Sequence, residues 1–278
     1  MDVLMADKIW LGTDGSSPTD FNTAANWSPS GVPGASDNVR LVAAYSNNMA
    51  GYDASGVALA DVIIEQGYVG TIGSKTADLQ INCTYFEYAG GGLSYIDLGA
   101  SSVSPRIIAT GGSAGSGQYS LYLIGTGVGV LSVEGGSVGV AAIHGQASTV
   151  TTIRQRGGSV KVGAGATITN FTSYQGSGLV ATNVTTAKLY GGTLTTAEQA
   201  AITTATIEAG TLVHNGTGTI TTATINGGEL DLARSGAART VTTLNLNPGG
   251  GLKYDPDAIT ITNNSEADAP ISIITSAL

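Results

Sequence analysis

The sequence Leu189-Tyr-Gly-Gly-Thr-Leu194 decides the fold, because close copies of it follow as Ile207-Glu-Ala-Gly-Thr-Leu212 and Ile225-Asn-Gly-Gly-Glu-Leu230. Each copy places one apolar residue before a glycine corner and another after it. The last glycines of the three copies are evenly spaced, at positions 192, 210 and 228. A short phrase that recurs at a fixed period of about 18 residues indicates a solenoid, in which each repeat forms one coil.

Further copies extend the pattern in both directions. Leu131-Ser-Val-Glu-Gly-Gly-Ser-Val138 and Ile153-Arg-Gln-Arg-Gly-Gly-Ser-Val160 place their last glycines at positions 136 and 158. The next step, from 158 to 192, is nearly twice as long, and a degenerate copy around Gly176 divides it into two. A last step from position 228 reaches Gly250. This spacing therefore predicts roughly seven coils over residues 128–255.

The side-chain pattern within a repeat is that of a β-strand. In Thr219-Ile-Thr-Thr-Ala-Thr-Ile225 apolar residues alternate with β-branched polar residues, as in a strand with one buried face. No helical spacing of apolar residues is seen from Leu131 to the end of the chain. The glycines are expected at corners that need a positive φ. We therefore predict an all-β fold, a right-handed parallel β-helix whose coils stack about 4.8 Å apart.

Composition agrees with a thin, ordered solenoid and excludes several classes of protein. Charged residues make up 11% of the chain, against about 25% in ordinary domains, whereas 42% of the residues are apolar. The net charge is −9, and the nearest approach to a basic cluster is Arg154, Arg156 and Lys161, which we expect to be solvated on one face of a coil. This charge argues against a nucleic-acid partner.

The chain carries no sign of membrane insertion or of classical secretion. Its apolar runs are too short for a transmembrane helix, and its start lacks the pattern of a signal peptide. Cys83 is the single cysteine, so no internal disulfide is expected. We therefore expect synthesis in a reducing cytoplasm and no membrane partner.

The first part of the chain differs from the repeats and predicts a cap. Residues 1–60 hold both tryptophans and many turn residues, so we expect an aromatic, turn-rich β cap over the open end of the solenoid. Residues 61–127 are expected to form wider coils, residues 128–255 the regular helix, and residues 256–278 a closing strand segment. Short strands are predicted at 38–43, 62–65, 78–81 and 106–109.

The opening residues resemble structural proteins of tailed bacteriophages. The resemblance rests on Lys8-Ile-Trp-Leu-Gly-Thr13, on Asn26-Trp-Ser-Pro-Ser-Gly-Val-Pro-Gly-Ala-Ser-Asp-Asn-Val39 and on Val62-Ile-Ile-Glu-Gln-Gly-Tyr-Val-Gly-Thr-Ile72. It implies a capsid decoration (cement) protein on the virion surface, a homo-trimer whose partner is the major capsid protein. Similar Asn-Trp-Ser phrases open bacterial surface β-helices, so this alternative stays open.

Trp10, Trp27, Pro29 and Pro33 are the residues that we expect at the partner interface, because large aromatic side chains dominate interface energetics. Packing in the core of the cap is the alternative for each of them. No catalytic residue, cofactor or metal is predicted, and the expected function is structural rather than enzymatic.

The main alternative is a tailspike-like protein or surface adhesin that binds host carbohydrate. Exposed tyrosines would then stack on sugars, and the candidates are Tyr119, Tyr122, Tyr174 and Tyr190.

A polysaccharide-degrading enzyme is disfavoured, because such enzymes need paired carboxylates or a basic residue with bound calcium. Acids between 130 and 250 are few, namely Glu134, Glu198, Glu208, Glu229 and Asp231. Glu208 and Glu229 are separated by slightly more than one coil and are candidates to be neighbours, whereas Glu229 and Asp231 are both expected to face outward.

The remaining chemically active residues carry no recognised motif. His144 and His214 are far apart, and Cys83 has no nearby histidine. Asp14, Asp20, Asp37, Asp53 and Asp61 stand in loop-like contexts where calcium is an alternative, although the spacing of a calcium loop is missing.

Overall fold

The computed structural model describes residues 6–100, 102–108, 119–143, 145–197, 199–233, 238–266 and 272–275. The fold is all-β, with 56% strand, 2% helix and about 11 stacked parallel coils, which confirms the predicted solenoid. The chain divides into two compact units, Met1–Val150 and Thr151–Leu278. The finer division predicted at residues 60, 127 and 255 stays a prediction.

The first unit begins with short strands and continues with longer ones. In order, its elements are β1 (Asp7–Trp10), η1 (Ala24–Asn26), β2 (Trp27–Ser28), β3 (Asn38–Leu41), η2 (Ala43–Tyr45), β4 (Asp53–Ile64), β5 (Leu79–Tyr88), β6 (Ser94–Asp97), β7 (Arg106–Ile107), β8 (Leu121–Ile124), β9 (Val128–Val133) and β10 (Ser137–Val140). The strands predicted at 62–65 and 78–81 lie in the longer β4 and β5 except for Glu65 and Asp78, which fall just outside them. Of the strand predicted at 106–109, β7 covers the first two residues, and Ala109 lies outside the described residues.

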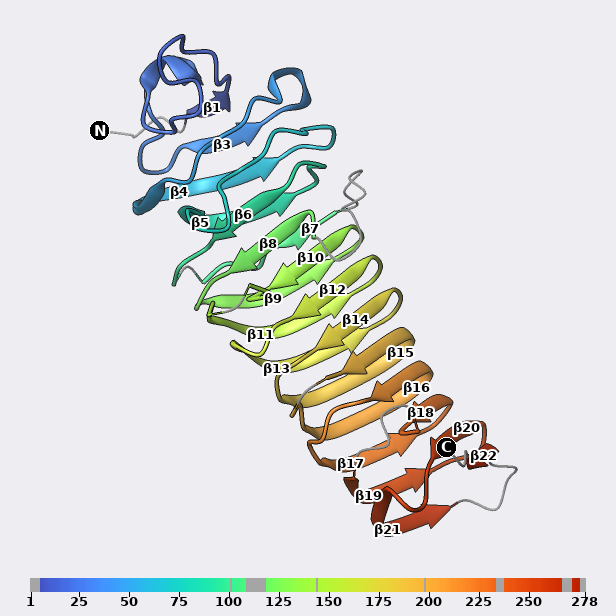
Figure 1. Ribbon diagram of the computed structural model, residues 1–278. Helices are drawn as coiled ribbons and strands as arrows, with labels where there is room; N and C mark the ends of the chain where they lie inside the picture. The colour runs from blue at the N-terminus through green and yellow to red at the C-terminus, as the bar shows by residue number, and fades with distance from the viewer. Residues whose placement is uncertain are drawn as a thin grey trace. The chain divides into compact units, whose positions relative to one another are not determined.

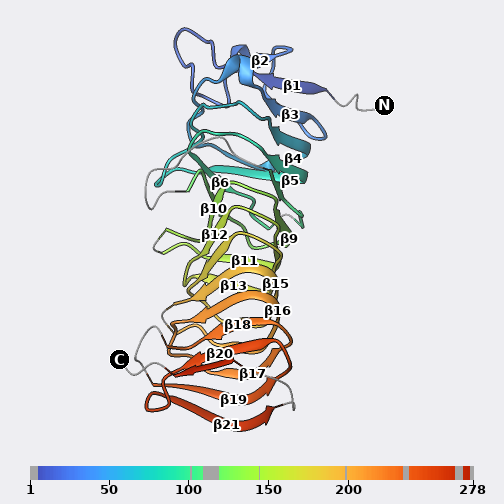
Figure 2. The ribbon, with the colours of Figure 1, turned by 90° about the vertical axis from the view of Figure 1, so that its right-hand side faces the viewer.

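The N-terminal end of this unit is covered by an antiparallel strand. Strands β1, β3, β4 and β5 pair in parallel in that order, whereas β2 pairs antiparallel with β1 (Figure 2). Strand β2 therefore occupies an edge of β1 that would otherwise offer unpaired backbone groups. The rings of Trp10 in β1 and Trp27 in β2 meet edge-on, with their centroids 5.0 Å apart, and the ring of Phe21 meets Trp27 edge-on at the same centroid distance. This is the aromatic cap that the composition of the segment predicts.

The second unit contains the regular coils. The strand β11 (Ser148–Gln155) carries the chain into it. There follow β12 (Ser159–Val162), β13 (Ala166–Ser173), β14 (Ser177–Val180), β15 (Val184–Thr196), β16 (Ile202–His214), β17 (Ile220–Ile225), β18 (Gly228–Asp231), β19 (Arg239–Leu246), β20 (Gly250–Tyr254), β21 (Ile259–Glu266) and β22 (Ser272–Thr275). Of the predicted closing segment, residues 256–266 and 272–275 are described, whereas residues 267–271 and 276–278 lie outside the described residues.

Each coil contributes to two rows of strands that meet at a glycine corner. In Figure 1 the strands β17, β19 and β21 follow one another in the first row, and β18, β20 and β22 in the second. The long strands β15 and β16 pass through the corner, so each belongs to both rows. Val184 of β15 pairs with Ile202 of β16, and Ile202 with Ile220 of β17, so these coils repeat at the interval of the corner glycines. The next coil is longer, because Ile220 pairs with Val241.

The core consists of apolar ladders that run from coil to coil. One ladder is Ile168, Val184, Ile202, Ile220 and Val241; a second is Phe171, Ala187, Ala205, Ala223 and Leu244; a third is Leu189, Ile207, Ile225 and Leu246. All of these side chains are buried. Each fully buried Ile or Leu contributes about 1.5–3 kcal/mol, so the ladders are a main source of stability. Two threonines separate Ile220 from Ala223, and the predicted strict alternation therefore slips by one residue in each coil.

The predicted corner glycines have positive φ. The residues are Gly136, Gly158, Gly176, Gly192, Gly210 and Gly228, with φ between 66° and 88°. The prediction is wrong for the last copy, where Gly249 has a φ of 87° and Gly250 is the first residue of β20. Within the second unit the corners stack closely. A Cβ atom on Gly210 would lie 2.4 Å from the carbonyl oxygen of Gly192, so only glycine fits this corner.

Candidate functional site

The four residues predicted at a partner interface lie mostly inside the cap. Trp10 is 0% exposed and Trp27 is 2% exposed, and their indole N–H groups donate to the carbonyls of Asn47 and Phe21. Pro33 is buried, and only Pro29 is exposed. The structure thus places three of the four in the core, which is the alternative that the sequence leaves open. Their role at an interface stays a prediction.

The outer face of the first row in the second unit carries two polar columns. One column is Asn170, Thr186, Thr204, Thr222, Thr243 and Asn263; the other is Thr172, Lys188, Thr206, Thr224, Asn245 and Ser265. Because the coils are in register, threonines of successive coils stand next to one another. Where the column changes from threonine to asparagine, Asn245 donates to Thr224 Oγ1 at 3.2 Å. We call this surface the threonine face. It is half-buried and neutral over most of its length.

Basic and aromatic side chains gather at the β13 end of the threonine face, next to β11. Tyr174 and Tyr190 are 43% and 48% exposed, and their rings stack with centroids 5.2 Å apart and planes 13° from parallel. The guanidinium of Arg156 lies 5.9 Å from the ring centre of Tyr174. Arg154 and Lys188 line the same hollow, whose volume is about 460 Å³. We call these five residues the tyrosine–arginine cluster.

Register explains why the cluster forms. Tyr174 N donates to Gln155 O at 2.8 Å, which aligns Tyr174 with Arg156 of the preceding coil. Arg156, Tyr174 and Tyr190 each stand two residues before a corner glycine, at 158, 176 and 192. Arg154, Thr172 and Lys188 stand four residues before the same glycines and form the adjoining column. The shared offset from a corner glycine is the sequence signal that groups these residues once the register of the coils is known.

The basic cluster expected from the sequence is therefore replaced by a different set. Lys161 lies in β12 and pairs with Leu179 of β14 in the second row, beyond the glycine corner. Lys188, which comes two coils later in the chain, takes its place beside the two arginines. The prediction that Lys161 shares a face with them is wrong, because the corner turns the chain between Arg156 and Lys161.

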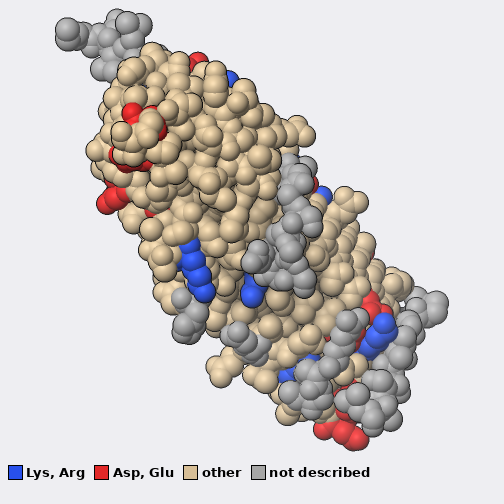
Figure 3. Space-filling view, turned by 45° about the horizontal axis from the view of Figure 1, so that its top comes forward, with Lys and Arg blue, Asp and Glu red and all other residues tan. Residues whose placement is uncertain are grey.

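Some cations of the described residues form ion pairs, whereas Arg154 and Lys188 of the cluster, like Lys75 and Lys161, do not. Arg40, Arg106 and Lys253 each form an ion pair, with Glu65, Glu87 and Glu229. In the described part of the chain, no such pair is found for Arg154 or Lys188. Charged side chains are sparse on the face seen in Figure 3, where most of the surface is neutral. Two accessible cations beside two exposed rings are thus unusual for this protein.

Of the four predicted exposed tyrosines, two are markedly exposed. Tyr119 and Tyr122 of the first unit are half-buried, with their rings edge-on at 5.8 Å, and Tyr122 stacks on Tyr95 at 4.8 Å. They support one another in a compact cluster. Tyr174 and Tyr190 are therefore the better candidates for contact with a ligand.

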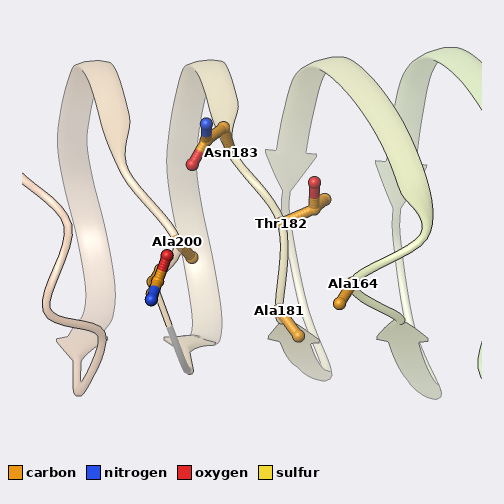
Figure 4. Close-up of a pocket in the computed structure, with 6 residues that line it drawn as sticks. Ala164, Ala181, Thr182, Asn183 and Ala200 are labelled. Carbon is orange, nitrogen blue, oxygen red and sulfur yellow. The ribbon is translucent and has the colours of Figure 1, made fainter.

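A second hollow in this unit is less suited to binding. Ala164, Ala181, Thr182, Asn183, Gln199 and Ala200 line it, on the loops between coils (Figure 4). Thr182 Oγ1 donates to Ala166 O at 2.7 Å, and Asn183 Oδ1 accepts from Ala201 N at 2.9 Å. The side chains of Thr182 and Asn183 already form hydrogen bonds with the backbone, and the other labelled side chains in Figure 4 are alanines.

The structure does not assemble the carboxylates considered for an enzyme. Glu208 accepts from Asn226 Nδ2 at 2.8 Å in the first row, whereas Glu229 pairs with Lys253 in the second row. Asp231 is 3% exposed, so the prediction that it faces outward is wrong. Glu198 and His144 lie outside the described residues. Burial raises the pKa of the Cys83 thiol to about 12, which leaves it protonated and unreactive at neutral pH.

Most of these aspartates accept hydrogen bonds that stabilise local turns. Asp14 Oδ1 accepts from the backbone N–H groups of Ser16 and Ser17, and Asp37 accepts from Gly34 N and Ala6 N. Asp20 and Asp53 accept in the same way from residues two or three positions later. Asp53 and Asp61 both belong to strand β4 rather than to a loop. No group of three His, Cys, Asp or Glu side chains that would hold a metal ion is found among the described residues.

A buried polar cluster in the second unit has no counterpart in the sequence analysis. His214 Nε2 donates to Gly218 O at 2.7 Å, so its Nδ1 accepts from Thr196 Oγ1, 2.6 Å away. Arg239 is 4% exposed and donates to the carbonyls of His214 and Leu232. The neutral ring is thus fully satisfied beside a buried guanidinium. This cluster holds the loop after β16 against the start of β19.

This arrangement predicts a pH-dependent stability. Burial, and then the charge of Arg239, lowers the pKa of His214, whereas the hydrogen bond to Gly218 opposes that shift. In the unfolded chain the ring titrates at about 6.5, so below that pH the unfolded state binds the proton more readily. We expect the urea midpoint of the second unit to fall as the pH is lowered from 7.5 to 5.5.

Two measurements separate His214 from other titrating groups. The variant His144→Gln, which removes the other histidine of the sequence, should keep the pH dependence. An NMR titration of the His214 ring should give a pKa below 6.5. A ring that titrates above 6.5 would contradict the prediction.

No protein family, curated protein or solved structure was found to match this chain. In the part of the chain that the structure describes, no helix combines the length and the apolar character needed to span a membrane.

Proposed function

We propose that this chain is a non-enzymatic structural protein of a virion, a capsid decoration protein that binds the outer capsid surface and stabilises it. The proposal rests on the resemblance of its opening residues to phage structural proteins. The threonine face supports it, because a broad neutral surface of short side chains has few charges to desolvate when it is covered by a partner. A homo-trimer would present three copies of this face, and several weak contacts made together dissociate slowly.

The threonine face is the structural observation that best supports the proposal. It extends over successive coils in register, from Asn170 of β13 to Asn263 of β21. Threonine, its commonest residue, is β-branched and has few rotamers, so docking costs little side-chain entropy. A regular array of this kind suits a regular surface such as a capsid lattice, with the major capsid protein as partner.

Light scattering and co-sedimentation with undecorated capsid shells test this function. We expect three copies of the 27.7 kDa chain, about 83 kDa, and binding of the trimer to shells. The double variant Thr204→Glu with Thr222→Glu places charges at the centre of the face and should weaken shell binding about tenfold or more. Thr193→Glu with Thr211→Glu, on neighbouring coils of the second row, is the matched control. Wild-type protein that ignores shells would overturn the proposal.

Carbohydrate binding is the second candidate, as in a tailspike-like protein or surface adhesin. The observation that favours it is the stacked, exposed pair Tyr174 and Tyr190 with Arg156 beside it. Aromatic rings of this kind offer an amphipathic surface at low entropic cost. A flat, open face binds a chain of sugars along its length rather than enclosing one ring.

A further inference from the structure

The geometry points to the tyrosine–arginine cluster as a binding site for an acidic saccharide, one whose sugar rings carry carboxylate groups. This inference rests on carbohydrate binding, the second candidate function, and names the class of ligand. It is carried by five side chains from three adjacent coils: Arg154, Arg156, Tyr174, Lys188 and Tyr190.

The two tyrosines provide the surface for the sugar rings. Arg156 covers one side of Tyr174, and Tyr190 covers the other. On the next coil Tyr190 pairs with Ala209, and Glu208 stands at the equivalent position two residues before Gly210, where its carboxylate accepts from Asn226 Nδ2 at 2.8 Å. Among the described aromatic residues, Tyr174 stacks on Tyr190, and the Tyr190 side chain remains 48% exposed. An apolar face of a sugar can pack there while its hydroxyls remain in water.

The cations define the charge of the ligand. Lys188 precedes Tyr190 by two residues on the same outer face, and Arg154 precedes Arg156 in the same way. Arg154 and Lys188 belong to coils two steps apart, which corresponds to about 10 Å along the solenoid. Charges so far apart fit successive carboxylates on a sugar chain better than one small anion. Arginine binds a carboxylate with two parallel hydrogen bonds, and this adds direction to the attraction.

The space between the cations is polar and uncharged. Thr152, Asn170, Thr172 and Thr186 line the same hollow, and Asn170 donates to Thr152 Oγ1 at 3.2 Å. Hydroxyl and amide groups are donors and acceptors at once, which matches the hydroxyls of a sugar. A nucleic acid fits less well, because it carries a phosphate at every nucleotide and the protein has a net charge of −9.

The test compares one polymer with and without its charge. Polygalacturonate and its methyl ester share a backbone and differ in the carboxylates, so titration calorimetry of the full chain with both measures the ionic contribution. We expect the acid to bind at least about tenfold more tightly than the ester, because a charge-assisted hydrogen bond contributes that much. The difference should shrink as salt is raised. A single-stranded oligonucleotide is included as a competing polyanion.

Three variants locate the site. Lys188→Gln should weaken binding of the acid about tenfold and leave the ester unchanged, whereas Tyr190→Ala should weaken both. Lys161→Gln removes one charge from the second row and is the matched control. Urea unfolding of each variant checks that the coils remain intact, and all three positions lie on the outside of the strands.

The outcomes distinguish carbohydrate binding in general from preference for an acidic saccharide. Equal binding of acid and ester, lowered by Tyr190→Ala, would overturn the acidic class and keep carbohydrate binding. Binding of neither polymer would overturn both. Tighter binding of the oligonucleotide, lost in Lys188→Gln, would assign the cluster to nucleic acid instead. Tighter binding of the acid, lost in Lys188→Gln but kept in Lys161→Gln, would support the inference.

Discussion

Replacing Gly210 by alanine is expected to destabilise the second unit by about 2–4 kcal/mol. Two effects add. The φ of 81° costs an alanine about 1–2 kcal/mol, and overpacking a close contact costs a further 1–3 kcal/mol. The new Cβ atom would lie 2.4 Å from Gly192 O and 2.8 Å from the carbonyl carbon of Gly191, both of which are backbone atoms of the preceding coil. The lower entropy of the unfolded alanine chain offsets up to about 1 kcal/mol.

Two other glycines separate these effects. Gly249 has a φ of 87°, but the nearest atom to its added Cβ is Asn226 O at 3.8 Å, so Gly249→Ala tests the backbone conformation alone. Gly227 lies outside the positive-φ region, and its Cβ would meet Glu208 O at 2.5 Å, so Gly227→Ala tests the contact alone. Urea unfolding followed by circular dichroism gives the free energies. Hydrogen exchange of peptides from residues 184–231 locates the loss.

The close packing of this corner also predicts a rank order for the destabilisation caused by the three glycine variants. Gly210→Ala should be more destabilising than either Gly249→Ala or Gly227→Ala. If Gly210→Ala unfolds at the wild-type urea concentration, the stacked corner is not a constraint on the sequence, and the conformational reason for the repeating glycine would be wrong.

Truncating Trp27 to alanine is expected to destabilise the first unit by about 3–5 kcal/mol. The ring is 2% exposed and contacts Trp10 and Phe21 edge-on, at centroid distances of 5.0 Å each. Its Nε1–H donates to Phe21 O at 2.7 Å, and the truncation leaves this buried carbonyl without that donor. Urea unfolding monitored by the fluorescence of Trp10, the other tryptophan, measures the loss.

The same variant decides between the two roles considered for Trp27. Tyr45→Ala removes a 43% exposed ring from the same unit and should change stability by no more than about 0.5 kcal/mol. If Trp27→Ala instead keeps the wild-type midpoint and loses binding to capsid shells, Trp27 acts at the partner interface, and its burial in the cap would be wrong. A large loss of stability with intact binding would assign it to the core.

In the coils, the residues that stabilise the fold are different from those proposed to bind a partner. In the first row, the ladders that begin with Ile168, Phe171 and Leu189 hold the coils together, whereas the columns that begin with Asn170 and Thr172 face outward. Substitutions on the outer columns leave the ladders in place, so the two sets of predictions can be tested independently. Only the corner glycines serve both, because they fix the register in which outer side chains meet.

The amino-acid sequence by itself determined the class of fold. The regular spacing of glycines and the β-branched apolar positions are local properties, and they predict coils, strands and corners because each follows from nearby residues. The same reasoning failed where local order is not decisive. Asp231 is buried, and it interacts electrostatically with Arg239, which lies on a later strand. For Trp10 and Trp27 the sequence leaves the core and an interface open, and the pairing of β2 with β1 brings both rings into the core.

The tertiary structure alone decided which outward residues meet. Arg156, Tyr174 and Tyr190 stand at unequal spacings along the chain, and they form a surface only because the coils pair with those particular offsets. Lys161 is closer in sequence to Arg156 than Lys188 is, yet the corner at Gly158 sends it to the other row. Hydrogen bonding between coils sets this register, and it acts between residues that are distant in sequence, so no local pattern specifies the site by itself.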